Sequence, residues 1–161
     1  MKKLIVAAIC LLWLGFIFFN SSQNGDKSNT RSFNILNNIR EEYRSIKGEN
    51  KKDYSKLPAS SRDEKFNLFI RKNAHAFEYC VLAVVITILL FCFGLKGKGA
   101  IVYILFICLL YAVLDEFHQL YVPGRTSQVS DVLVDFLGAN LGMWFSYLIY
   151  YCVLKRKNKK I

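Results

Sequence analysis

The stretch from Phe136 to Leu154, FLGANLGMWFSYLIYYCVL, contains nineteen consecutive residues without a charged side chain. Residues 4–19, 79–95 and 100–114 form three further uncharged blocks of sixteen, seventeen and fifteen residues. A helix needs about 20 predominantly apolar residues to cross the hydrocarbon core of a bilayer. In chain order, the third block (100–114) reaches this length only when residues 115–122 are added. The second and fourth blocks reach it when they are extended at their N-terminal ends, to Ala74 and Val129.

Four helices that are apolar all round cannot be buried inside a soluble domain of 161 residues. The sequence therefore predicts an all-α integral membrane protein, a four-transmembrane-helix bundle that forms one domain over residues 1–161. The expected spans are about 4–20, 74–95, 100–121 and 130–154, and residues 21–73 are expected to form an outside loop.

The composition excludes two other classes of protein. The chain carries a formal net charge of +10 and has 53% hydrophobic and 15% aromatic residues. A disordered basic tail lacks aromatic residues to bury. A soluble nucleic-acid-binding domain also carries such a charge, but it does not concentrate its apolar residues into long uncharged blocks. We therefore expect membrane lipids, and not nucleic acid, as partners.

Positive charges flank the predicted spans. Lys2 and Lys3 precede the first span, Lys96 and Lys98 follow the second, and five Lys/Arg residues follow the fourth within residues 155–160. An even number of spans places these three clusters on one face, and the positive-inside rule makes that face cytoplasmic. The sequence therefore predicts a multi-pass protein of the cell membrane with both termini in the cytoplasm.

The outside loop contains an amphipathic pattern. Its apolar residues recur at helical spacing, and they are Phe33, Leu36, Ile39, Tyr43 and Ile46. This spacing predicts an extracytoplasmic amphipathic helix that lies on the outer membrane surface or caps the bundle. The following residues, 47–61, contain Gly, Pro and Ser and are expected to form a linker.

Ionisable residues lie near the outer ends of the predicted spans, where their burial is costly and indicates a function. They are Glu78, Asp115, Glu116, Asp131 and Asp135, together with both histidines, His75 and His118. In the predicted topology, the outer ends of the second, third and fourth spans place these side chains at the same depth in the membrane. Mutual pairing or partial protonation is expected there, because unpaired buried charges cost several kcal/mol each.

On the second span, Arg71, His75 and Glu78 share one helix face. The i, i+3 pair His75–Glu78 suits metal ligation, a histidine held by a carboxylate, or a buried hydrogen bond. The spacing alone leaves these three alternatives open.

On the third span, Asp115, His118 and Gln119 fall on one side, while Glu116 points toward another neighbour. If the protein binds a metal ion, the candidate ligands are His75, Glu78, Asp115 and His118. The sequence indicates no particular cofactor.

Arg125 follows a dipeptide, Pro123-Gly124, that suits positions i+1 and i+2 of a type II turn and would hold the arginine in a fixed place. A guanidinium matches a carboxylate or a phosphate bidentately. Arg125 therefore either neutralises the protein's own acids or binds a lipid or substrate anion. Arg71 and Gln119 are further candidates for contacts with such a ligand.

The fourth span places Asp131, Asp135, Gly138 and Gly142 on one stripe. The two glycines form a G-x-x-x-G pattern, which lets a neighbouring helix approach closely. Since the stripe continues from the carboxylates into the glycines, the helix face that packs is expected also to present the acids.

Five segments resemble the VanZ-like family. They are FNSSQ (19–23), RKNAHAFEY (71–79), DEFHQ (115–119), VPGR (122–125) and DVLVD (131–135), the last followed by Gly138. The resemblance covers most of the chain apart from residues 30–65. It implies a small bacterial multi-spanning membrane protein, in a family named for a member associated with low-level resistance to the glycopeptide teicoplanin.

Three functions are compatible with the outward polar layer. The first is a cell-envelope membrane protein that engages a lipid-linked precursor or a lipid-anchored component, including an acylated lipoglycopeptide such as teicoplanin. The second is an intramembrane metal- or acid/base-dependent enzyme acting on a lipid-linked substrate, although neither an H-E-x-x-H nor a G-x-S-x-G motif is present. Its candidate catalytic residues are His75, Glu78, Asp115, Glu116, His118, Asp131 and Asp135. The third is a proton-coupled transporter, for which four spans give room only in an oligomer.

Overall fold

The computed structural model describes residues 1–48 and 61–154, and within these ranges it contains five α-helices and no strand. The elements are α1 (Lys2–Ser21), α2 (Gly25–Ile46), α3 (Ser61–Cys92), α4 (Lys98–Gln119), α5 (Val129–Ile149) and a π-helical turn, η1 (Tyr150–Leu154), that continues α5. The all-α fold class predicted from the sequence is confirmed.

Four of these helices, α1, α3, α4 and α5, are long and apolar enough to cross a membrane. Large apolar side chains cover their outer surfaces: Leu12 is 74% exposed, Phe106 61% and Leu141 63%. A soluble protein avoids such a continuous apolar surface, whereas lipid tails solvate it. The four-helix membrane bundle is therefore confirmed.

α3 begins at Ser61, earlier than the predicted start of the second span near residue 74. Its first turn carries Asp63 and Glu64, whose negative charges stabilise the positive end of the helix dipole. Charged residues flank the apolar residues of segment 61–73, which include Phe66, Leu68 and Phe69, so this part of the helix does not form a long uncharged block. The extension brings Arg71 and Lys72 onto a continuous helix with His75.

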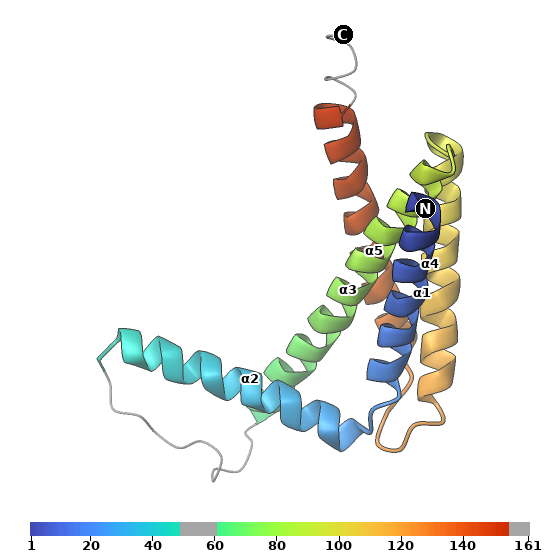
Figure 1. Ribbon diagram of the computed structural model, residues 1–161. Helices are drawn as coiled ribbons and strands as arrows, with labels where there is room; N and C mark the ends of the chain where they lie inside the picture. Colours follow the sequence, from blue (N-terminus) through green and yellow to red (C-terminus); the bar gives the residue numbers. More distant parts are fainter. Residues whose placement is uncertain (49–60, 155–161) are drawn as a thin grey trace.

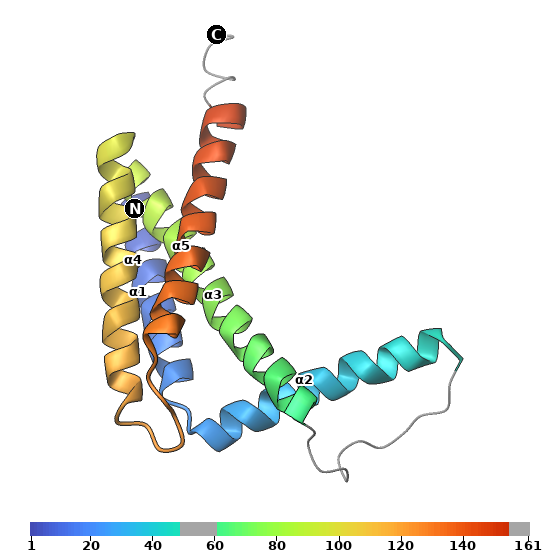
Figure 2. The ribbon, with the colours of Figure 1, turned by 180° about the vertical axis from the view of Figure 1, so that it is seen from behind.

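The amphipathic helix predicted in the outside loop corresponds to α2. Figures 1 and 2 show α2 running away from the other helices, across the direction of α1 and α4, with the polar start of α3 beside it. Leu36 is buried at this contact, and Arg40 forms an ion pair with Asp63. The predicted linker falls largely on residues 49–60, which lie outside the described residues.

The closest helix contact joins α3 and α5 through the two glycines of the G-x-x-x-G pattern. A Cβ atom added at Gly138 would overlap the carbonyl oxygen of Ala76, and one added at Gly142 would overlap that of Cys80. The predicted close approach is therefore confirmed. The surrounding core uses compact or flat side chains, and its fully buried members include Tyr79, Leu82, Ala83, Ile104, Cys108 and Ala112.

The described basic clusters meet at one end of the bundle. The ammonium Nζ of Lys3 lies 5.0 Å from the centre of the Phe93 ring, and that of Lys96 lies 5.0 Å from the Tyr150 ring. The start of α1 and the end of α5 lie at this end in Figure 1, whereas α2 lies at the opposite end. We call these the basic end and the polar end of the bundle.

Candidate functional site

Polar side chains from the five helices and from the α4–α5 loop converge at the polar end of the bundle. They are Arg71, His75 and Glu78 of α3, Asp115, Glu116 and Gln119 of α4, Arg125 of the α4–α5 loop, and Asp131 and Asp135 of α5, joined by residues from the end of α1 and the start of α2. Among the candidates named from the sequence, only His118 faces elsewhere. Its Nε2 lies 3.1 Å from the Ser22 hydroxyl, and its ring lies 4.5 Å from that of Phe18.

Two neighbouring cavities lie within this cluster. The small cavity has a volume of about 10 Å³, close to the space of one water molecule or ion. Its lining is formed by Arg71, Lys72, His75, Glu116, Gln119, Arg125, Asp131, Val134 and Asp135. The large cavity has a volume of about 140 Å³ and shares Arg71, His75 and Arg125 with the small one.

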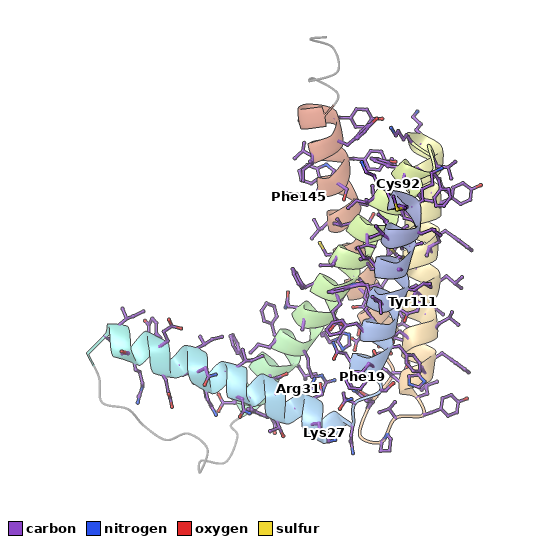
Figure 3. All side chains as sticks on the ribbon, viewed as in Figure 1. Phe19, Lys27, Arg31, Cys92, Tyr111 and Phe145 are labelled. Atoms are coloured by element: carbon purple, nitrogen blue, oxygen red, sulfur yellow. The ribbon has the colours of Figure 1, made fainter. Side chains whose placement is uncertain are left out.

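Three arginines from separate elements line the large cavity: Arg31 of α2, Arg71 of α3 and Arg125 of the α4–α5 loop. Figure 3 shows Arg31 at the polar end, far from Cys92 at the other end of α3. The carboxylate in the lining is that of Glu78. The large cavity is therefore positively charged.

The guanidinium of Arg71 is only partly satisfied. Its Nη1 donates to Asn29 Oδ1 at 2.9 Å, whereas its buried Nε has no hydrogen-bond partner among the described residues. A buried donor without a partner costs about 1–3 kcal/mol. An acceptor entering the large cavity would recover this loss.

The Val122–Arg125 turn positions Arg125, which like Arg71 is half-buried. Arg125 N donates to Val122 O at 3.2 Å, and Gly124 has a positive φ of 73°, as the predicted type II turn requires. Gly25 N donates to Pro123 O at 3.1 Å, which fixes the turn against the start of α2. A side chain at Gly25 would overlap the Gly124 carbonyl, so this junction excludes any larger residue.

Arg125 binds backbone oxygens, not the protein's carboxylates. Its Nε donates to Gln23 O at 3.3 Å and its Nη2 to Asn20 O at 3.4 Å, which places the guanidinium over the carbonyl end of α1. Within the described residues it forms no ion pair with an acid. Burial and the neighbouring Arg71 lower the pKa of the Arg125 guanidinium from its ordinary value. The charges of Asp115, Glu116 and Glu78 act in the opposite direction on this pKa.

Three of the four acids on α4 and α5 have separate partners among the described residues. Glu116 Oε2 accepts a hydrogen bond from Gln128 N, at the N-cap of α5, at 3.0 Å. Asp131 forms an ion pair with Lys72. Asp115 Oδ2 accepts from the Ser21 hydroxyl at 2.7 Å and from Gln119 Nε2 at 3.2 Å.

The His75–Glu78 pair has the spacing predicted from the sequence but an open geometry. His75 Nδ1 and Glu78 Oε2 are 3.6 Å apart, which is too long for a hydrogen bond. Glu78 Oε1 instead accepts from Asn20 Nδ2 at 2.7 Å. Among the metal-ligand candidates, the structure groups His75 and Asp115 with Asp135, and leaves Glu78 and His118 outside that group.

Sequence reasoning missed the contribution of α1 and α2 to this site. The end of α1 donates hydrogen bonds from Asn20 to Glu78 and from Ser21 to Asp115, and the carbonyl of Gln23 accepts one from Arg125. On α2, Asn29 accepts a hydrogen bond from Arg71. The signal was available for α1, because the polar run 20–23 directly follows the C-terminal end of an uncharged block. The residues on α2 carried no comparable signal.

Comparison with known proteins identifies the family. No curated protein and no solved structure matches the chain significantly. The family model described as VanZ/LLP1 matches residues 6–150, which include most of α1, all of α2 to α5 and every site residue described above. The chain therefore belongs to the VanZ/LLP1 family.

Proposed function

We propose that this VanZ-like protein binds the anionic headgroup of a lipid-linked or lipid-anchored component of the cell envelope in the large cavity. The observation that carries the proposal is the convergence of Arg31, Arg71 and Arg125 on one cavity. Arg71 and Arg125 form no ion pair with an acid in the described part of the chain, so their charges are available to a ligand.

The chemistry of the cavity favours a phosphate. A guanidinium binds phosphate bidentately, and such charge-assisted hydrogen bonds are about twice as strong as neutral ones. A volume of about 140 Å³ is smaller than the 300–1,000 Å³ of an ordinary ligand pocket. It therefore suits the headgroup next to the lipid chain and not an entire glycan or peptide.

The location fits a lipid ligand. The cavity lies where α1 and α4 end and where exposed aromatic residues such as Phe19 surround the bundle. A ligand held there keeps its chain in the bilayer and its charge in the cavity. A role in teicoplanin-type resistance would use the same place, because the acyl chain of that antibiotic anchors it in the membrane.

An intramembrane enzyme acting on the same lipid-linked substrate is the second candidate. It is favoured by His75, which lines both cavities beside the arginines and has an unpaired Nδ1 in the described structure. A neutral imidazole next to bound phosphate can act as a general base. Release of inorganic phosphate or of a shortened lipid from the bound substrate distinguishes this candidate from simple binding.

The binding proposal is tested with two matched lipids, a polyprenyl phosphate and the polyprenol of the same length. We expect the purified protein in detergent to bind the phosphate and not the alcohol. Arg71→Gln should weaken binding about tenfold or more, because it removes one charge-assisted contact. Thermophoresis or a shift in melting temperature measures both affinities.

The control for charge is Arg40→Gln, which removes an arginine that pairs with Asp63 on the side of α2. Its affinity for polyprenyl phosphate should equal that of the parent. Equal binding of the phosphate and the alcohol, or parent-like binding by Arg71→Gln, would contradict the proposal.

We further propose that the polar end faces outward and the basic end faces the cytoplasm of the bacterial cell. The support is the meeting of Lys3 and Lys96 at one end, together with the positive-inside rule. In a variant without native cysteines, an impermeant thiol reagent applied to intact cells should label Ser45→Cys and leave Lys96→Cys unlabelled. The reverse pattern would invert the topology and place the arginines in the cytoplasm.

A further inference from the structure

Three potential metal ligands from three helices meet beside the small cavity. His75 of α3, Asp115 of α4 and Asp135 of α5 each offer one ligand atom, and these atoms all lie within 4.8 Å of one another. Asp115 and Asp135 are each only 3% exposed. Since the three residues are distant in sequence, the tertiary fold itself creates this group.

The three side chains are incompletely satisfied by the protein. Asp115 Oδ1 and His75 Nδ1 are buried without a hydrogen-bond partner in the described part of the chain. The described residues also provide no hydrogen bond or ion pair to the Asp135 carboxyl group. Buried polar atoms in native proteins almost always have a partner, including water or an ion. His75 Nδ1 lies 3.6 Å from Glu78 Oε2, which also lacks a hydrogen-bond partner, whereas a cation between the three ligand atoms would supply the partner that Asp115 Oδ1 lacks.

The charges around the group show the sign of that partner. The polar layer of α3, α4 and α5 and the loop between them contains five carboxylates and three cationic side chains. Asp131 forms an ion pair with Lys72, whereas the hydrogen bonds of Arg71 and Arg125 go to Asn29 and to backbone oxygens and not to the acids. Two carboxyl groups, those of Asp115 and Asp135, meet at the group of three ligand atoms, so a cation is the partner of matching sign.

We propose that His75, Asp115 and Asp135 bind a divalent transition-metal ion of the Zn²⁺ or Mn²⁺ type. One imidazole nitrogen and two carboxylate oxygens are ordinary ligands for such ions. Bonds of about 2.0–2.2 Å would draw the three atoms together by up to about 1.5 Å, a shift within reach of side-chain rotation. The inference does not depend on the proposed lipid function.

The surroundings are suited to holding the ligands in place. Asp115 Oδ2 is fixed by Ser21 and Gln119, which leaves Oδ1 to the ion. Such hydrogen bonds to a ligand carboxylate typically raise metal affinity by about 10–100-fold. Three protein ligands leave a fourth position open, and the small cavity of about 10 Å³ has room there for one water molecule.

The test uses the full chain with an affinity tag that contains no histidine, in the cysteine-free background so that thiols cannot bind metal. After incubation with Zn²⁺ or Mn²⁺ and removal of free ions, elemental analysis should find about one ion per chain. His75→Gln and Asp135→Asn should each reduce the metal content to less than about one tenth. His118→Gln is the matched control, because His118 contacts Ser22 outside the group, and it should retain the ion.

Melting temperatures separate loss of metal from loss of fold. A chelator should lower the melting temperature of the parent and of His118→Gln, and leave that of Asp135→Asn unchanged. In chelator, Asp135→Asn should melt no lower than the parent, because the amide keeps the shape and removes one unbalanced charge. Two results would overturn the metal site: a parent that binds neither ion, or a His75→Gln variant that binds as much as the parent.

Discussion

Replacing Gly138 by alanine is expected to separate α5 from α3 and to reduce the folded protein in the membrane to a small fraction of the parent amount. The added Cβ would overlap the carbonyl oxygen of Ala76, a backbone atom that can move only if α3 moves. Overpacking a core costs about 1–3 kcal/mol, and occasionally more, and a backbone clash belongs at the upper end of this range. Expression level and melting temperature in detergent measure the effect.

Gly142→Ala should act in the same way through the Cys80 carbonyl, and Gly15→Ala is the matched control. Gly15 lies in α1 with no atom near its hypothetical Cβ, so alanine there should be neutral or raise stability by up to about 1 kcal/mol through helix propensity. A Gly138→Ala variant that melts like Gly15→Ala would show that α3 and α5 are not packed as described.

The same contact also controls the site. His75 directly precedes Ala76 on α3, and Asp135 lies one helical turn before Gly138 on α5. The close approach of the two helices therefore sets the distance between the imidazole and the carboxylate. A larger residue at position 138 would separate these groups even in molecules that still fold.

The sequence carries enough information to predict the bundle because uncharged blocks have a direct physical meaning in a bilayer. It also predicts α2, since Leu36 and its apolar neighbours repeat at helical spacing. The start of α3 was not predictable in this way. Charged residues on both sides keep the apolar residues 66–70 from forming a long uncharged block. The helix there is stabilised by Asp63 and Glu64 in the first turn and by the Arg40–Asp63 pair with α2.

For the site, topology alone predicts that the polar ends of α3, α4 and α5 share a layer. Spacing cannot predict how each helix is rotated about its axis against its neighbours. Asp115 and His118 lie three residues apart on α4, yet Asp115 points to Ser21 in the interior and His118 to Ser22 at the side of α1. For this reason Asp135, and not His118, joins His75 and Asp115.

Replacing Arg125 by alanine should abolish most of the binding of polyprenyl phosphate while leaving the fold nearly intact. The guanidinium contacts the carbonyls of Asn20 and Gln23 at 3.4 and 3.3 Å and forms no ion pair with a described acid. Its removal therefore costs about 0.5–1.5 kcal/mol per hydrogen bond and leaves no broken ion pair behind. The loss of a charged contact to phosphate should lower affinity about tenfold or more.

Asp115→Ala provides the comparison for a broken buried interaction. It removes the acceptor of both Ser21 and Gln119 and should lower the melting temperature clearly more than Arg125→Ala does. Arg40→Ala is the matched control, because it removes an arginine that lies outside the large cavity. Its affinity for polyprenyl phosphate should equal that of the parent. If Arg125→Ala melts as low as Asp115→Ala, the arginine stabilises the bundle by balancing its acids. If it also binds polyprenyl phosphate like the parent, Arg125 is not part of the anion site, and the charge of the large cavity has a structural role.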